Sequence, residues 1–340
     1  MKYFLYLFIL PIFLLSCDSS PRLSDYFNYS GRQQLNGGAQ MIEISTPKGD
    51  FNVWTKRVGN NPDIKVLILH GGPGFNHEAY EAFDSFLPAE GIEYYYYDQL
   101  GSFFSDQPED TSLWKTERFV EEVEQVRRAL GLDSSNFYLY GHSWGGILGI
   151  EYALKYQENL KGLIISNMMS SVPDYNAYAD NVLAQQLDPE VLKQLRDFEA
   201  RGEYHHPRYM ELLMQHYYTE HLMRMPIEEW PEPFTRAFEH FNEQVYVLMQ
   251  GPSEFGITKD ALLYDWDRTE ELAQIEVPTL VIGAQHDTMD PEHKRMMADR
   301  LPNGRYHHCP NGSHMAMYDD QQIYFDGLIK FLQEVDSGRF

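Results

Sequence analysis

Cysteine is scarce in this sequence, and its scarcity excludes two kinds of protein. The 340 residues contain two cysteines, Cys17 and Cys309. Two cysteines cannot build the disulfide framework of a small secreted scaffold or the four-thiolate cluster of a zinc ribbon. We therefore expect a fold that depends on a hydrophobic core, for which the chain is long enough, and a site without a metal or other cofactor.

Basic residues are also few. The chain has 27 lysines and arginines against 51 aspartates and glutamates, which gives a formal net charge of −24. Nucleic-acid binding requires a basic surface, so we expect no nucleic-acid partner. Hydrophobic residues make up 43% and charged residues 23%, an ordinary globular balance that excludes a disordered, collagen-like or coiled-coil chain.

Long apolar runs are absent except at the start of the chain. Residues 3–15 are apolar, Pro11 interrupts them, and a small residue and Cys17 follow. This order is typical of a secretory signal, and the run is short for a bilayer span. Because L-L-S-C at 14–17 resembles the bacterial lipobox, we expect a signal peptide at 1–16 and a lipid on Cys17. The alternatives are an uncleaved anchor and an ordinary signal peptide with a chance cysteine.

A lipid on Cys17 predicts an exported bacterial lipoprotein that is anchored in a membrane and faces the periplasm or the cell surface. Residues 17–38 are polar and include Ser, Pro, Asn and Gly. Such a composition is typical of a tether, so we expect the folded part to begin near residue 39.

The rest of the chain alternates short β-rich runs with helical patterns, which is typical of a parallel sheet covered by helices. Strands are expected at 65–69, 92–97, 136–140, 160–166, 279–283 and 305–308, with an opening hairpin at 41–45 and 51–55. Apolar residues at helical spacing predict helices at 119–130 and 147–156.

One segment, residues 169–268, breaks this alternation. It has helical patterns without a convincing strand, several prolines, and many Tyr, Met, His and Glu residues. We expect a helical cap there, inserted between the first part of the core at 39–168 and the second part at 269–340.

A glycine-rich motif marks the expected nucleophile. G-H-S-W-G-G at 141–146 lies between an expected strand and an expected helix, which is the context that the G-x-S-x-G nucleophile elbow requires. Glycines permit the sharp turn, and the turn places Ser143 at a helix N-terminus, where backbone amides favour negative charge. We therefore expect Ser143 to be the nucleophile. The alternative is a glycine-rich turn with an incidental serine.

A serine nucleophile needs a base and an acid that orients the base. Asp287 follows the strand at 279–283, and His314 follows the strand at 305–308. Parallel strands gather functional groups beyond their carboxyl ends, so we expect His314 to be the base and Asp287 its orienting acid. The nearby competitors are Asp290, His286, His307 and His308.

The run H-G-G-P-G at 70–74 follows another expected strand. In this position a loop can donate an amide to an oxyanion, together with the amide of the residue after the nucleophile. We therefore expect Gly72 and Trp144 to form the oxyanion hole. No Lys-Ser/Thr pair follows, so the run is not a phosphate loop.

With these residues in place, the chain resembles the α/β-hydrolase superfamily and, within it, the proline iminopeptidase (prolyl aminopeptidase) family over about 41–332. The narrower features are H-G-G-P-G at 70–74, Asp-Gln at 98–99, G-H-S-W-G-G at 141–146, and G-P-S-E-F at 251–255 before D-W-D at 265–267. The resemblance implies an α/β-hydrolase fold with a helical cap. It also implies a serine aminopeptidase that releases an N-terminal residue, typically proline, from short peptides with a free N-terminus. Glu254 is then the carboxylate that holds the substrate ammonium.

Two positions depart from the family pattern. Relatives often carry a second glutamate directly after the catalytic aspartate, where this sequence has Thr288, and G-x-G-x-S where residues 101–105 read G-S-F-F-S. Two alternative functions therefore remain open. The first is an esterase or amidase that uses the same triad, and the second is a non-catalytic, surface-binding lipoprotein on a hydrolase scaffold.

Overall fold

The computed structural model describes residues 23–340. The expected signal peptide at 1–16 and the expected lipid site at Cys17 lie outside the described residues.

The centre of the fold is an eight-stranded sheet with the order β1-β2-β4-β3-β5-β6-β7-β8. Its strands are β1 (Ala39–Thr46), β2 (Gly49–Val58), β3 (Lys65–Leu69), β4 (Glu93–Asp98), β5 (Phe137–His142), β6 (Gly162–Ser166), β7 (Thr279–Ala284) and β8 (Gly304–Cys309). The pairs β1–β2 and β2–β4 are antiparallel, and every later pair is parallel. The expected fold class, a mostly parallel sheet in an α/β protein, is confirmed.

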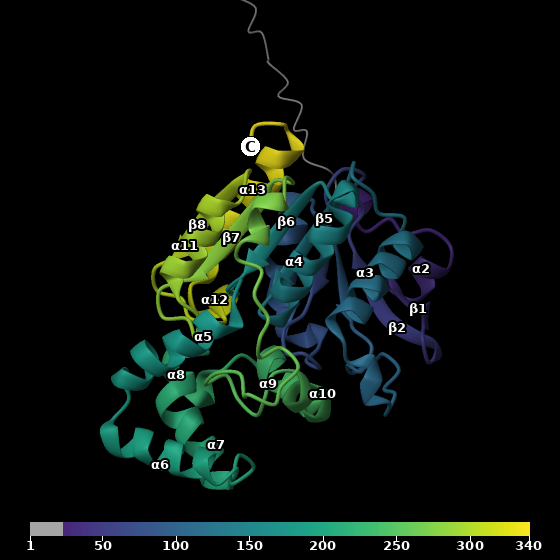
Figure 1. Cartoon of the computed structure of the whole chain (residues 1–340). Coiled ribbons are helices and arrows are strands. Elements are labelled where there is room, and N and C mark those ends of the chain that lie inside the picture. Colours follow the sequence, from purple (N-terminus) through teal and green to yellow (C-terminus); the bar gives the residue numbers. More distant parts are fainter. Residues whose placement is uncertain (1–22) are drawn as a thin grey trace, which may run out of the picture.

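Helices cover both faces of the sheet (Figure 1). One face packs against α3 (Thr116–Leu130), α4 (Trp144–Tyr156) and α11 (Pro291–Arg300). The other packs against η1 (His77–Ser85), η2 (Leu87–Glu90) and α13 (Gln321–Asp336), which follows the short α12 (Ala316–Asp319). The helix α3 illustrates why the pattern works: its apolar residues at i, i+3 and i+4 spacing face the sheet, and Gly131 ends it with φ 66°.

Strand β4 lies inside the sheet although it consists of four tyrosines between two acids. All six of its residues are buried. Alternate side chains point to opposite faces, and each tyrosine hydroxyl finds a carboxylate: Tyr94 and Tyr96 donate to Asp84 on η1, while Tyr97 donates to Glu122 on α3. The hydroxyls therefore tie the strand to helices on both faces, and the burial of these polar groups is compensated.

The end of the expected tether is part of the folded body. Residues 23–38 contain α1 (Leu23–Tyr26) and α2 (Arg32–Leu35), and Tyr26 is only 3% exposed. Its hydroxyl donates to the carbonyl of Ile92 at 2.5 Å, and its ring packs on Gly59. A contact between residues far apart in sequence leaves no local pattern. The composition therefore predicts a tether as far as residue 38, although residues 23–38 belong to the folded body.

The inserted segment between β6 and β7 consists of helices that gather at one end of the core, away from the C-terminus (Figure 1). They are α5 (Val172–Tyr178), α6 (Pro189–Ala200), α7 (Pro207–Leu213), α8 (Thr219–His221), α9 (Glu232–Glu239) and α10 (Glu243–Met249). The π-helical turns η5 (Ala179–Leu183) and η7 (Met214–Tyr218) extend α5 and α7. A single bridge between Ser171 and Asp267 joins the two ends of the insertion.

The helix α9 fixes this cap to the core. Arg236 pairs with Glu78 and Glu81 of η1, each at 2.7 Å. Asn76 donates to the carbonyl of Ala237 at 2.8 Å. Among residues 23–340, no helix has the length and apolarity needed to cross a bilayer.

Candidate active site

Ser143 occupies the sharp turn between β5 and α4. Its backbone has φ 55° and ψ −125°, a strained conformation for a residue with a side chain. Neighbouring glycines permit the turn because a Cβ on Gly145 would lie 2.3 Å from the carbonyl oxygen of Leu69, and one on Gly141 would lie 2.0 Å from that of Gly145. Ser143 is 4% exposed and lines a cavity of about 460 Å³ beneath the cap.

His314 lines the same cavity as Ser143. Its Nδ1 lies 2.8 Å from Oδ1 of Asp287 and donates to it, so Nε2 is free to act as the base. Asp287 is fully buried in the loop after β7, and His314 lies in the loop after β8. The structure thus places the three expected residues beyond the carboxyl ends of β5, β7 and β8, strands of the parallel part of the sheet.

The Asp287 carboxylate has further partners that the sequence did not reveal. Its Oδ2 accepts from Nδ2 of Asn167 at 2.8 Å and from the ammonium of Lys294, which is itself fully buried. Burial alone would raise the pKa of Asp287, but the Lys294 charge and the His314 contact outweigh it and hold that pKa below its ordinary value. Burial lowers the pKa of Lys294, and Asp287 opposes this effect. The acid therefore stays ionised and fixed in place.

The competing residues have other partners. Asp290 accepts from the amide of Glu292 and caps α11. His307 contacts the carbonyl of Ile323 at 2.8 Å, and the half-buried His308 contacts the hydroxyl of Tyr306 at 3.1 Å. His286, His307 and His308 are not among the residues that line the cavity.

A hydrogen bond between a serine and a histidine lies outside the cavity. The hydroxyl of Ser170 is 2.9 Å from Nε2 of His293, but Ser170 is fully buried and its hydroxyl also contacts Thr269. No substrate can reach this pair, so it serves as an internal control for the reactivity of Ser143.

The amides expected for the oxyanion hole belong to Gly72, in the loop after β3, and to Trp144, the residue that follows Ser143. Gly72 lines the cavity with φ 104°, and Trp144 begins α4, where the first amides have no partner within the helix. The preceding amide, that of Gly71, already donates to the hydroxyl of Tyr80 at 2.7 Å. The geometry therefore favours Gly72 over Gly71 as the donor from this loop.

His142 holds the loop of His314 in place. Its Nε2 lies 2.9 Å from the carbonyl of His314, and since a carbonyl only accepts, Nε2 carries the proton. Its Nδ1 then accepts from Tyr80 at 3.0 Å. Burial, and next the proximity of His314, lower the pKa of His142 to about 3, so the ring stays neutral in this chain of hydrogen bonds.

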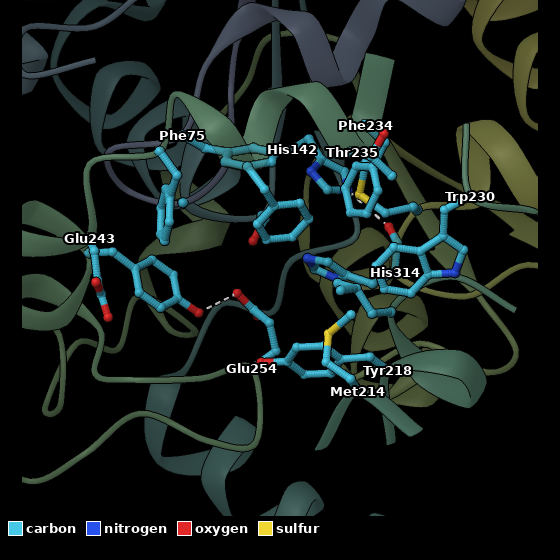
Figure 2. Close-up of a pocket in the computed structure, with 18 of the residues that line it drawn as sticks. Phe75, His142, Met214, Tyr218, Trp230, Phe234, Thr235, Glu243, Glu254 and His314 are labelled. Carbon is cyan, nitrogen blue, oxygen red and sulfur yellow. Dashed lines mark hydrogen bonds between the residues drawn. The ribbon is translucent and has the colours of Figure 1, made fainter. Parts of the chain in front are cut away.

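Glu254 lines the cavity from the cap, and Figure 2 shows its side chain on the same side of His314 as Glu243. One carboxylate oxygen, Oε1, accepts from the hydroxyl of Tyr246 at 2.6 Å and from Gln250 at 3.1 Å. The other oxygen, Oε2, is buried and has no hydrogen-bond partner in the described part of the chain. A buried carboxylate oxygen without a donor is costly, so this atom indicates a missing cationic or donor group.

The backbone of Glu254 is held by three tyrosines. Its amide donates to Tyr218 at 3.1 Å, and its carbonyl accepts from Tyr175 at 2.6 Å and Tyr217 at 3.3 Å. These contacts fix the carboxylate without neutralising it.

The two departures from the family pattern lie away from the cavity lining. Thr288 is fully buried, and its hydroxyl contacts Asp287 and His314, each at 3.3 Å. In the 101–105 segment, Phe103 stacks on Phe104 and on His240 of the cap, with ring centroids 3.8 Å apart in each case. Neither Thr288 nor any residue of 101–105 is among the residues that line the cavity.

Sequence reasoning missed Lys294, although a signal was present. Lys294, Met297, Ala298 and Leu301 have i, i+3, i+4 and i+7 spacing, which marks the buried face of α11. A lysine on that face, in the helix after the catalytic acid, requires a buried anion. Asn167, His142 and Tyr246 have no comparable signal. Within residues 23–340, no cluster of three or more His, Cys, Asp or Glu side chains is arranged to hold a metal ion.

The sheet order and the series Ser143, Asp287, His314 at strand ends define an α/β hydrolase. Residues 65–321 match the family described as alpha/beta hydrolase fold. Among curated proteins, the chain is 55% identical over 297 residues to a proline iminopeptidase of Flavobacterium johnsoniae, covering 87% of this chain and 99% of the relative. It is also 55% identical over 300 residues to one of Elizabethkingia meningoseptica, covering 88% and 100%.

Solved structures agree with these relatives. The proline iminopeptidase of Mycobacterium smegmatis has a TM-score of 0.77 and 28% identity, covering 89% of this chain and all of the other. The structure of VinJ has a TM-score of 0.80 and 27% identity, covering 87% and 99%. The chain therefore belongs to the α/β-hydrolase fold family and, within it, to the proline iminopeptidase family, so the resemblance inferred from the motifs is confirmed.

Ser143→Ala should abolish covalent labelling by a fluorophosphonate and lower turnover by a factor on the order of 10⁶, because within residues 23–340 no other serine and no cysteine lines the cavity. Asp287→Asn should lower turnover by a factor on the order of 10⁴, since the base loses its orientation. Ser170→Ala is the matched control and should label like the wild type. Persistent labelling of Ser143→Ala would mean that another residue is the nucleophile.

Lys294→Met should move the acid limb of the kcat/KM profile to higher pH. Without the ammonium, one of the charges that hold the pKa of Asp287 below its ordinary value is lost, so this carboxylate takes up a proton at higher pH and then no longer orients His314. Removal of a charge in direct contact with the carboxylate should shift the acid limb by about one pH unit. Lys294→Arg keeps the charge and should keep the acid limb. If Lys294 only fills space, the melting temperature of Lys294→Met falls while its acid limb stays where it is in the wild type.

Proposed function

We propose that this chain is a serine aminopeptidase that releases an N-terminal residue, proline by preference, from short peptides with a free N-terminus. The observation that carries the proposal is the unpartnered Oε2 of Glu254, which lies in the same cavity as Ser143. The names of the relatives support the preference for proline.

The reaction begins with the serine. The hydroxyl of Ser143 attacks the carbonyl carbon of the first residue while Nε2 of His314 takes its proton. The amides of Gly72 and Trp144 stabilise the negative oxygen that forms. The protonated His314 then gives its proton to the leaving amine, and the acyl-enzyme remains. Water, activated by His314, cleaves this ester and releases the free amino acid.

Glu254 sets the register of the substrate. In an aminopeptidase, the scissile carbonyl lies one residue from a positively charged amine. A carboxylate with one unused, buried oxygen can hold that amine by a charge-assisted hydrogen bond. A peptide with an acylated N-terminal proline would present a tertiary amide, which has neither a charge nor an N–H, and would leave Oε2 unpaired. An ester without an amine would have no group to bind to Oε2, so its hydrolysis should not depend on the charge of Glu254.

The apolar wall of the cavity suits a pyrrolidine ring. Phe75, Met214 and Tyr218 line it, and a cavity of about 460 Å³ has room for more than one residue. Thr288 supplies no second carboxylate, because its hydroxyl contacts Asp287 and His314. Glu254 therefore carries more of the amine binding than it would in a relative with two glutamates.

Glu254→Gln should lower kcat/KM for proline p-nitroanilide by about 30- to 1000-fold, because a buried charged hydrogen bond loses its charge. Hydrolysis of p-nitrophenyl acetate, which has no amine, should change little. Raising the pH until the substrate amine is neutral should narrow the gap between wild type and variant.

The exposed Glu239 on α9 is the matched control, and Glu239→Gln should behave like the wild type. Equal losses of Glu254→Gln on the anilide and the acetate would indicate that Glu254 only supports the cap. The chain would then be assigned as an esterase or amidase that uses the same triad.

The chain is further proposed to be an exported lipoprotein, with a lipid on Cys17 that anchors it to a membrane. The support is the apolar run at 3–15 followed by L-L-S-C at 14–17. An enzyme anchored in this way would keep its cavity in the aqueous phase outside the bilayer, where it can bind soluble peptides.

Cys17→Ala should move the protein from the membrane fraction to the soluble fraction, because each buried CH₂ of an acyl chain contributes about 0.8 kcal/mol to membrane binding. Intact-mass measurement should find acyl chains on the wild type and not on the variant. Cys309→Ala is the control, since this thiol is buried in the core. An unacylated mass and unchanged fractionation would refute the anchor.

A further inference from the structure

The cavity has two chemically different ends, with His314 between them. Figure 2 shows Glu254 and Glu243 on one side of His314, and Trp230, Phe234 and Thr235 on the other. The hydrogen bonds agree with this division. Glu254 is tied to tyrosines of the cap, whereas the amides of His314 and Met315 donate to the carbonyls of His221 and Leu222, in the segment that leads to Trp230.

At the end of the cavity that contains Trp230, Trp230 and Thr235 each use their donor group on a backbone carbonyl. The indole of Trp230 donates to the carbonyl of Met225 at 3.1 Å, and the hydroxyl of Thr235 donates to the carbonyl of Glu232 at 3.0 Å. Ile227 and Phe234 complete this end with aliphatic and aromatic surface. The acidic side chains that line the cavity, Glu243 and Glu254, lie at the opposite end.

The chemistry of the reaction assigns a part of the substrate to each end. If Glu254 holds the amine and Ser143 attacks the first carbonyl, the first residue lies between these two side chains. The leaving nitrogen must be near His314, which protonates it. The second residue then continues past His314, away from Glu254 and toward Trp230.

We propose that Ile227, Trp230, Phe234 and Thr235 form the subsite for the second residue of the peptide, and that this subsite selects an apolar side chain. The proposal rests on the aminopeptidase function proposed above. An apolar side chain buries surface there, whereas a carboxylate would lose its hydration without gaining a cation. Thr235 and Ile227 are exposed at the mouth of the cavity, so a peptide can continue beyond the second residue into solvent.

The test compares the dipeptide amides Pro-Leu-NH₂, Pro-Gly-NH₂ and Pro-Asp-NH₂ as substrates of the full-length protein. We expect kcat/KM to be about tenfold higher with leucine than with glycine in second place, and lower again with aspartate. Thr235→Lys places a cation at this end on an exposed side chain. It should raise kcat/KM for Pro-Asp-NH₂ relative to Pro-Leu-NH₂ by about tenfold.

The control for Thr235→Lys is Thr111→Lys, which makes the same change in net charge on an exposed residue of the core. It should leave the ratio of the two substrates unchanged. Equal kcat/KM values for the three amides would overturn the subsite, and so would a Thr235→Lys variant that affects Pro-Asp-NH₂ and Pro-Leu-NH₂ alike. Failure to cleave any prolyl amide would instead overturn the proposed aminopeptidase function, so the two failures are distinguishable.

Discussion

The buried carboxylate of Asp287 is the group around which the site is assembled. It accepts from Asn167 in the loop after β6, from Lys294 on α11 and from His314 after β8. A buried charge without partners costs several kcal/mol. A displacement of any of these donors would therefore destabilise the folded state, so the donors and the carboxylate keep one another in position. The contacts thereby tie together the loops after β6, β7 and β8, and they fix the orientation of His314, which lines the same cavity as Ser143.

The core and the cap contribute different residues to the cavity. The core supplies Ser143, His314 and the amides proposed for the oxyanion hole, and the cap supplies Glu254 and the apolar end of the cavity. The two parts are joined next to the oxyanion loop: Phe75, one residue beyond this loop, packs on Phe234, Phe238 and Phe241 of the cap, with ring centroids 5.2 to 6.1 Å apart. Aromatic packing of this kind is less dependent on salt than the nearby ion pairs of Arg236. A shift of the cap would therefore move the oxyanion loop as well.

The reactive residues could be predicted because local rules place them. A glycine-rich turn between strand and helix identifies Ser143, and loops at the carboxyl ends of parallel strands identify Asp287 and His314. The partners of these residues could not be predicted in the same way. Asn167 meets Asp287 across 120 residues of sequence, and Tyr246 meets Glu254 because the cap folds back on itself. No sequence pattern marks Tyr26 as a core residue either, because its ring is held in the core by packing over Gly59, which has no side chain. Patterns in sequence report periodicity and turns, whereas these contacts depend on how distant elements pack.

Tyr26 also sets the length of the segment that would join the folded enzyme to a lipid on Cys17. Its side chain is buried in the core, so only eight residues, 18–25, separate the proposed lipid on Cys17 from this fixed point of the folded body. A chain of that length reaches at most about 30 Å. The start of the described chain lies at the end of the core away from the cap (Figure 1). An enzyme tethered in this way would stand close to the bilayer with the mouth of its cavity turned outward, able to sample peptides in the surrounding fluid and unable to reach those lying flat on its own membrane.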